Sequence, residues 1–95
     1  MLNIKVIALL IATIQALNVL DFGTVTQGRA PTADQEFENA KAFELAMLAA
    51  NASATDRQVL LPKGTVVSIM PTTFTGVKNV QLTIEGTLLA SQNFK

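Results

Sequence analysis

Side chains able to act as acids, bases or nucleophiles are sparse in this 95-residue chain, and its three aspartates are the first candidates. Asp21, Asp34 and Asp56 each stand alone in the sequence, at the end of an expected strand or within an expected loop. Aspartate at such places commonly hydrogen-bonds the local backbone in turns and caps. We therefore predict structural roles for all three and assign no catalytic residue.

The absence of cysteine and histidine excludes several chemistries. Zinc sites built on these ligands, thiol nucleophiles, Ser-His-Asp triads and imidazole acid–base catalysis all require one or the other. We expect no cofactor and no metal site. The seven basic and seven acidic side chains cancel, so the chain has no net charge to attract nucleic acid, and no basic cluster suits a membrane surface.

A covalent modification is possible at Asn51. Asn51-Ala52-Ser53 is an N-glycosylation sequon, the acceptor triplet of secreted eukaryotic proteins. Asn51 is therefore a candidate glycan site, on the condition that the chain is secreted.

Residues 1–16 have the pattern of a secretory signal peptide. Lys5 precedes an almost wholly apolar run over residues 6–14, and Ala16 supplies a small residue at a suitable cleavage point. The apolar run is shorter than the roughly 20 residues that a membrane-spanning helix needs. We expect cleavage after Ala16, secretion and no membrane attachment afterwards; the alternatives are an uncleaved anchor and a buried first strand.

The mature chain, residues 17–95, can form one domain at most. A domain of this size buries only roughly 60% of the surface that its unfolded chain exposes, and small secreted domains usually add disulfides, which this chain lacks. Charged residues make up 15% of the sequence, below the roughly 25% of typical globular domains. We infer strands that are covered by further protein, and hence an incomplete domain.

One amphipathic helix is predicted over residues 39–51. The apolar residues Phe43, Ala46, Met47 and Ala50 recur at the spacing of one helix face. Burying this face against a core is the leading interpretation, and a partner-binding or membrane-surface helix is the rival.

The first residue of this helix is open. Asn39 could cap it, whereas Thr32 or Asp34 could cap a longer helix, and Thr32 with Gln35 fits a capping box.

Short strands account for most of the remaining chain. Alternating or β-branched apolar residues, bounded by glycine or proline, indicate them. Strands are expected at residues 17–22, ended by Gly23, and then at 59–61, 65–69, 80–85 and 87–90, with 72–75 as a further candidate and 24–31 as a loop.

Two of these segments are similar to each other. Gly64-Thr65-Val66-Val67 and Gly86-Thr87-Leu88-Leu89 match in order and lie 22 residues apart, within the roughly 20–45 residues of a solenoid repeat. If Gly64 and Gly86 mark the same corner of successive coils, the following strands stack in parallel. An antiparallel hairpin and a chance match are the alternatives.

Four stretches together resemble a known family. They are Val-Leu-Asp-Phe-Gly at 19–23, the helix at 39–50, Val-Leu-Leu-Pro-Lys-Gly-Thr at 59–65, and residues 79–90 with their Glu-Gly-Thr-Leu sequence. In this order and spacing they resemble glycoside hydrolase family 28, the polygalacturonases, and more broadly the pectate-lyase-like superfamily. The resemblance implies a mainly β fold, namely a right-handed parallel β-helix (solenoid) of which this chain holds the N-terminal capping helix and the first coils.

The chain departs from the family pattern before the helix. Thr26-Gln27-Gly28 stands where the family has Gly-Asp-Gly, and residues 37–40 stand where it has Asp-Asp-Thr. A second register, with residues 34–37 at that place, is also possible.

The resemblance implies a secreted enzyme that hydrolyses α-1,4 links in pectin, a polysaccharide of the cell wall. Such inverting hydrolases use two carboxyl groups held roughly 6.5–9.5 Å apart. In the family these belong to Asn-Thr-Asp and Asp-Asp motifs, aided by Gly-His-Gly and Arg-Ile-Lys, and none of the four motifs occurs here. We therefore expect an inactive N-terminal fragment of a protein that is monomeric when complete.

Two other functions stay open. The entry of a β-helix does not encode reaction type, so a polysaccharide lyase or a non-catalytic carbohydrate-binding or adhesive solenoid is the main alternative, and a free-standing structural module is a third. In each case the residues singled out are structural: the helix face Phe43, Ala46, Met47 and Ala50 over the coils, and the turn residues Gly23, Gly64 and Gly86.

Overall fold

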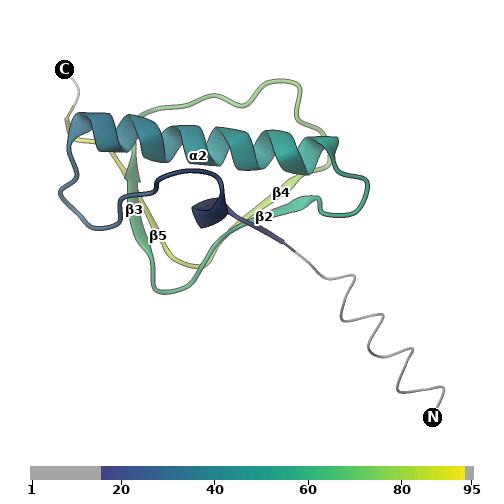
Figure 1. Cartoon of the computed structure of the whole chain (residues 1–95), viewed down its shortest axis with the longest axis horizontal. Coiled ribbons are helices and arrows are strands. Elements are labelled where there is room, and N and C mark those ends of the chain that lie inside the picture. The colour runs from purple at the N-terminus through teal and green to yellow at the C-terminus, as the bar shows by residue number, and fades with distance from the viewer. Residues whose placement is uncertain (1–15, 94–95) are drawn as a thin grey trace, which may run out of the picture.

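The computed structural model describes residues 16–93 (Figure 1). The expected signal peptide therefore lies outside the described residues, except for Ala16. The elements are β1 (Leu17–Asn18), the 3-10 helix η1 (Val19–Asp21), α2 (Ala33–Ala52), β2 (Gln58–Leu61), β3 (Val66–Ile69), β4 (Gln81–Ile84) and β5 (Thr87–Ala90). They form a small mixed domain of one long helix and short parallel strands. Among residues 16–93, no helix is both long and apolar enough to cross a membrane.

The strands form two parallel stacks. In the first, β2 lies between β1 and β4, and in the second β3 pairs with β5. Val59 pairs with Leu82, a step of 23 residues, whereas Val67 pairs with Leu88, a step of 21. The hairpin alternative is therefore wrong. Figure 1 shows the two stacks as the limbs of a V, with α2 crossing from one limb to the other.

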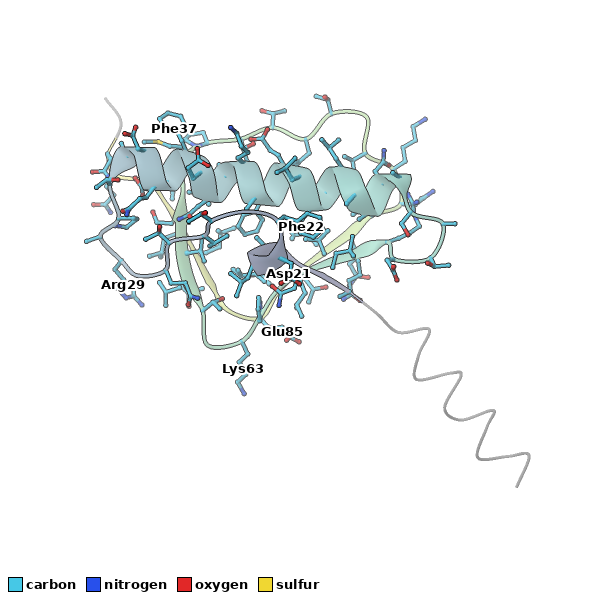
Figure 2. All side chains as sticks on the ribbon, viewed as in Figure 1. Asp21, Phe22, Arg29, Phe37, Lys63 and Glu85 are labelled. Carbon is cyan, nitrogen blue, oxygen red and sulfur yellow. The ribbon has the colours of Figure 1, made fainter. Side chains whose placement is uncertain are left out.

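The two limbs meet at the corner that the glycines predicted. We call the stretch of chain around β2 and β3 the first coil and the stretch around β4 and β5 the second coil. Residues 62–65 join β2 to β3, whereas residues 85–86 join β4 to β5, so the second coil turns this corner with two fewer residues. The 22-residue spacing of Gly64 and Gly86 in the sequence therefore falls between the two structural steps. Lys63 and Glu85 mark this corner in Figure 2.

The helix begins at Ala33, so the longer alternative is right. The Thr32 hydroxyl accepts a hydrogen bond from the Gln35 N–H at 3.2 Å, and the Gln35 Oε1 accepts one from the Thr32 N–H at 2.8 Å, which completes a capping box. Asn39 as a cap is wrong, because Asn39 is buried within the helix.

Two predicted strands differ from the structure. The first spans Leu17–Asn18 rather than residues 17–22, because the Asn18 Oδ1 accepts from the Leu20 N–H at 2.9 Å and turns the chain into η1. Residues 72–75 form no strand and belong to an irregular segment over residues 70–80. This segment carries the chain from the end of β3 back to β4.

The core lies between α2 and the V. Phe43, Ala46 and Ala50 are fully buried and Met47 is nearly so, so the expected face of the helix is the one that packs inward. They meet buried residues from both stacks and from η1: Val19, Val59, Leu61 and Val67. Burying a side chain such as that of Phe43 contributes roughly 1.5–3 kcal/mol, and this packing fixes the helix across both limbs.

Candidate functional site

The most concentrated polar site surrounds Glu36, a buried carboxylate in the first turns of α2. The Ser68 hydroxyl donates a hydrogen bond to Oε2, and the Ser91 hydroxyl donates one to Oε1 at 2.6 Å. The Asn93 amide also donates to Oε1 at 2.6 Å. We call these four residues the Glu36 cluster.

The cluster joins the helix to both coils. Ser68 comes from β3 in the first coil and Ser91 directly follows β5 in the second. Asn93 also donates to the Pro31 carbonyl at 3.0 Å, and so reaches the segment that leads into α2. One carboxylate thus holds three segments that lie far apart in the sequence.

Hydrogen bonding decides the protonation state of Glu36. The donors Ser68, then Ser91 and Asn93, hold the pKa of this carboxyl below its ordinary value, against the opposing effect of burial. The group is therefore ionised at neutral pH and acts as an acceptor. A general acid needs the opposite, a carboxyl that holds its proton until the substrate takes it.

A cavity of about 670 Å³ opens beside this cluster. Its polar lining comes from five side chains: Arg29, Glu36, Ser68, Gln92 and Asn93. Glu36 is the single carboxylate among the lining residues, so the cavity lacks the pair that glycoside hydrolysis needs. Its chemistry suits hydrogen bonding, and the exposed residue Arg29 adds a positive charge to its lining.

The three aspartates singled out from the sequence do not form a site. Asp21 lies exposed at the end of η1, and Asp34 lies exposed in the first turn of α2. Asp56 follows the helix, where its N–H donates to the Ser53 hydroxyl at 2.8 Å. Within residues 16–93, no group of three acidic side chains is placed to hold a metal ion.

The sequon residue Asn51 lies in the last turn of α2 and contacts the irregular segment. Its Nδ2 donates to the Gly76 carbonyl at 3.2 Å, and its Oδ1 accepts from the Lys78 N–H at 3.0 Å. The side chain that a glycan would modify therefore holds the path of the chain between β3 and β4.

Arg57 strengthens the same junction. Its guanidinium donates to the Ser53 carbonyl at 2.6 Å, at the C-terminal end of α2, and to the Asn79 carbonyl at 3.0 Å, just before β4. A cation at the carboxyl end of a helix is also favoured by the helix dipole. Asn51 and Arg57 thus join the helix to the second coil at one end, as the Glu36 cluster does at the other.

The three glycines singled out from the sequence occupy turns, for different reasons. Gly23 and Gly64 have φ values of 140° and 87°, a region that favours glycine. Gly86 has no such φ, but a Cβ there would lie 2.5 Å from the Pro62 carbonyl oxygen. Gly86 is therefore required by the close approach of the two coils.

Sequence reasoning missed the Glu36 cluster. Asn39 and Glu36 lie on the same helix face as Phe43, one and two turns before it in the sequence. Two polar residues on an otherwise apolar face were the feature of the sequence that could have indicated the cluster. Their partners are 13 to 57 residues away, which no local pattern indicates.

No family model, curated protein or solved structure matches the chain. The function proposed below therefore depends on the residues and geometry of the chain itself.

Proposed function

We propose that this chain forms the entry region of a secreted, polygalacturonase-like hydrolase of the parallel β-helix type that acts on pectin. In this proposal residues 17–95 supply the cap and first coils, and the catalytic carboxylates belong to later coils. The observation that carries it is the parallel stacking of successive coils, β2 on β4 and β3 on β5. Parallel, in-register coils that share a corner are the repeating unit of a solenoid.

The burial of equivalent positions supports a further coil. Leu61 in β2 is 0% exposed, whereas its register partner Ile84 in β4 is 44% exposed. Likewise Val67 in β3 is buried, whereas its partner Leu88 in β5 is only half-buried. The second coil thus presents apolar side chains that another layer would cover.

The free edges of the strands support the same conclusion. Within residues 16–93, β4 and β5 each pair on one side only, so both stacks have an unpaired edge at the second coil. Beside β5 lies an apolar groove of about 370 Å³, lined in part by Ile69, Leu88 and Leu89. Exposed edges with apolar neighbours invite strand pairing, and a third coil in the same orientation would satisfy both.

The helix suits the role of a cap. Solenoids need a terminal element that covers the first coil, because an open end would expose the core. Phe43 and its neighbours cover the first coil, while the Glu36 cluster and Arg57 fasten the two ends of α2. This arrangement supports a structural rather than a catalytic part for the described residues.

Sequencing the complete transcript and assaying its product tests the proposal. We expect further coils with the Asp-Asp and Gly-His-Gly motifs, and an expressed protein that releases reducing ends from homogalacturonan. A lyase would also release reducing ends but would leave an unsaturated sugar at the other new end, so we expect products without unsaturation. Continuing coils without these motifs would favour the lyase or the binding protein, and a stop codon directly after Lys95 would exclude the proposal.

A further inference from the structure

The outward face of α2 carries an apolar stripe that the fold leaves about half exposed. Phe37, Leu45 and Leu48 are 58%, 46% and 54% exposed, and they are three of the four exposed large apolar side chains among residues 16–93. Figure 2 places Phe37 on the side of α2 that faces away from the corner at Lys63 and Glu85. Isolated exposed apolar residues are common, but three along one helix face form a patch.

One basic and one acidic residue lie within this patch, between its apolar ends. Phe37, Lys41, Glu44 and Leu48 follow one another at intervals of four, three and four residues, the spacing of a seam between paired helices. Leu45 flanks this seam. We call these five residues the outer stripe.

We propose that the outer stripe binds the outer stripe of a second copy of the chain, with the two helices antiparallel. A two-fold axis between residues 42 and 43 sets Phe37 of each copy opposite Leu48 of the other. It likewise sets Lys41 of each copy opposite Glu44 of the other, so each pair occurs twice. Apolar side chains then meet at both ends of the contact and opposite charges meet in its middle. The pattern is therefore complementary to itself, as a two-fold interface requires.

The charges select the antiparallel orientation. Two parallel helices in register would set Lys41 against Lys41 and Glu44 against Glu44, and like charges at such positions are unfavourable. Glu44 also accepts a hydrogen bond from the Thr72 hydroxyl at 2.9 Å, which restricts the position of its carboxylate.

The contact is small, and this sets the expected affinity. A helix of 20 residues is about 30 Å long, and one helix face falls short of the roughly 800 Å² per partner of a stable interface. The dimer therefore dissociates on dilution. It differs from the monomer that the family resemblance implies, and it leaves the edges of β4 and β5 free.

Cysteine cross-linking tests the orientation, and the chain has no cysteine of its own. Phe37→Cys and Leu48→Cys variants of the full chain, carrying tags of different size, are oxidised separately and as a mixture. We expect the mixture to form mainly the mixed disulfide. Positions 37 and 48 lie about 16 Å apart along a helix, so each variant alone is out of disulfide range in the antiparallel dimer. Disulfides within each variant, a statistical mixture or no cross-link would overturn the proposal.

A charge reversal tests the pairing independently by sedimentation equilibrium. Lys41→Glu is expected to raise the dissociation constant of the full chain roughly tenfold, because two weak ion pairs become repulsive contacts. Adding Glu44→Lys to the same chain restores opposite charges in both contacts and is expected to return the constant to its starting value. A double variant that stays as weak as Lys41→Glu would contradict the pairing. Failure of either test leaves the pectin hydrolase proposal intact, because that proposal depends on the strand edges.

Discussion

Replacing Gly86 by alanine is expected to disrupt the contact between the two coils. The new Cβ would lie 2.4 Å from the Thr65 hydroxyl oxygen, 2.5 Å from the Pro62 carbonyl oxygen and 2.7 Å from the Thr65 carbonyl oxygen. The distance from this Cβ to the Pro62 carbonyl oxygen is about 0.9 Å shorter than 3.4 Å, the lower limit of ordinary Cβ contacts. Since two of the three neighbours are backbone atoms, the second coil must move away from the first.

That movement sets the size of the effect. Overpacking of this kind costs about 1–3 kcal/mol. It also lengthens the hydrogen bonds from the Thr87 N–H to the Thr65 carbonyl, at 2.8 Å, and from the Glu85 N–H to the Leu61 carbonyl, at 2.9 Å. Each is worth about 1 kcal/mol, so Gly86→Ala is expected to lower the free energy of unfolding by about 3–5 kcal/mol.

Gly64→Ala is the matched control at the same corner. Gly64 has a φ of 87° and nothing within 4 Å of its Cβ position, so its cost is backbone strain alone, about 1–2 kcal/mol. Thr65→Ala removes one of the three contacts at Gly86 and is expected to recover only a small part of the loss.

Urea denaturation of the protein made from the complete reading frame, followed by circular dichroism, measures these differences. Gly86→Ala no more destabilising than Gly64→Ala would refute the close approach of the coils. Full rescue of Gly86→Ala by Thr65→Ala would show that the side chain, not the backbone, forms the contact.

Three further outcomes are expected. Phe43→Ala should lower the free energy of unfolding by about 3–5 kcal/mol, and Phe43→Asp by more, whereas Leu48→Ala on the exposed face should change it by less than about 0.5 kcal/mol; equal effects in urea denaturation would argue against the packing of α2. Because hydrogen bonds lower the pKa of Glu36 from 4.5, its ionised form adds stability that is complete above that pH and is lost as the pH falls through the folded-state pKa. Thermal unfolding of Glu36→Gln at several pH values should therefore show a smaller loss on acidification than the parent chain, and identical profiles would contradict an ionised Glu36. Asn51→Ala should speed hydrogen exchange at the Lys78 amide, since that amide loses its acceptor, and unchanged exchange would show that other contacts hold the segment.

The two junctions at the ends of α2 explain how a short chain holds two coils in place. The Glu36 cluster fastens the N-terminal end of the helix to β3 and to the segment after β5. Arg57 and Asn51 fasten the C-terminal end to the segment before β4. Between them the apolar face of the helix buries the first coil, so the orientation of the helix depends on all three contacts together.

Local patterns in the sequence determined most of the elements, although not the strands expected at residues 17–22 and 72–75. The capping box of Thr32 and Gln35 sets the start of α2, because its two hydrogen bonds join residues only three positions apart. The buried face of Phe43 and the position of β4 likewise follow from the period of each structure. Such patterns depend on neighbours in the chain, so the sequence carries them.

The tertiary structure alone decided which distant residues meet. Gly64 and Gly86 look alike in the sequence, but one supplies a left-handed turn and the other makes room for Thr65 of the coil beside it. Asn39 has the chemistry of a helix cap, yet it lies inside the helix because Thr26 and Ser68 satisfy its amide. Hydrogen bonds and close packing act through space with no regard to sequence separation, and for that reason no local pattern could specify these partners.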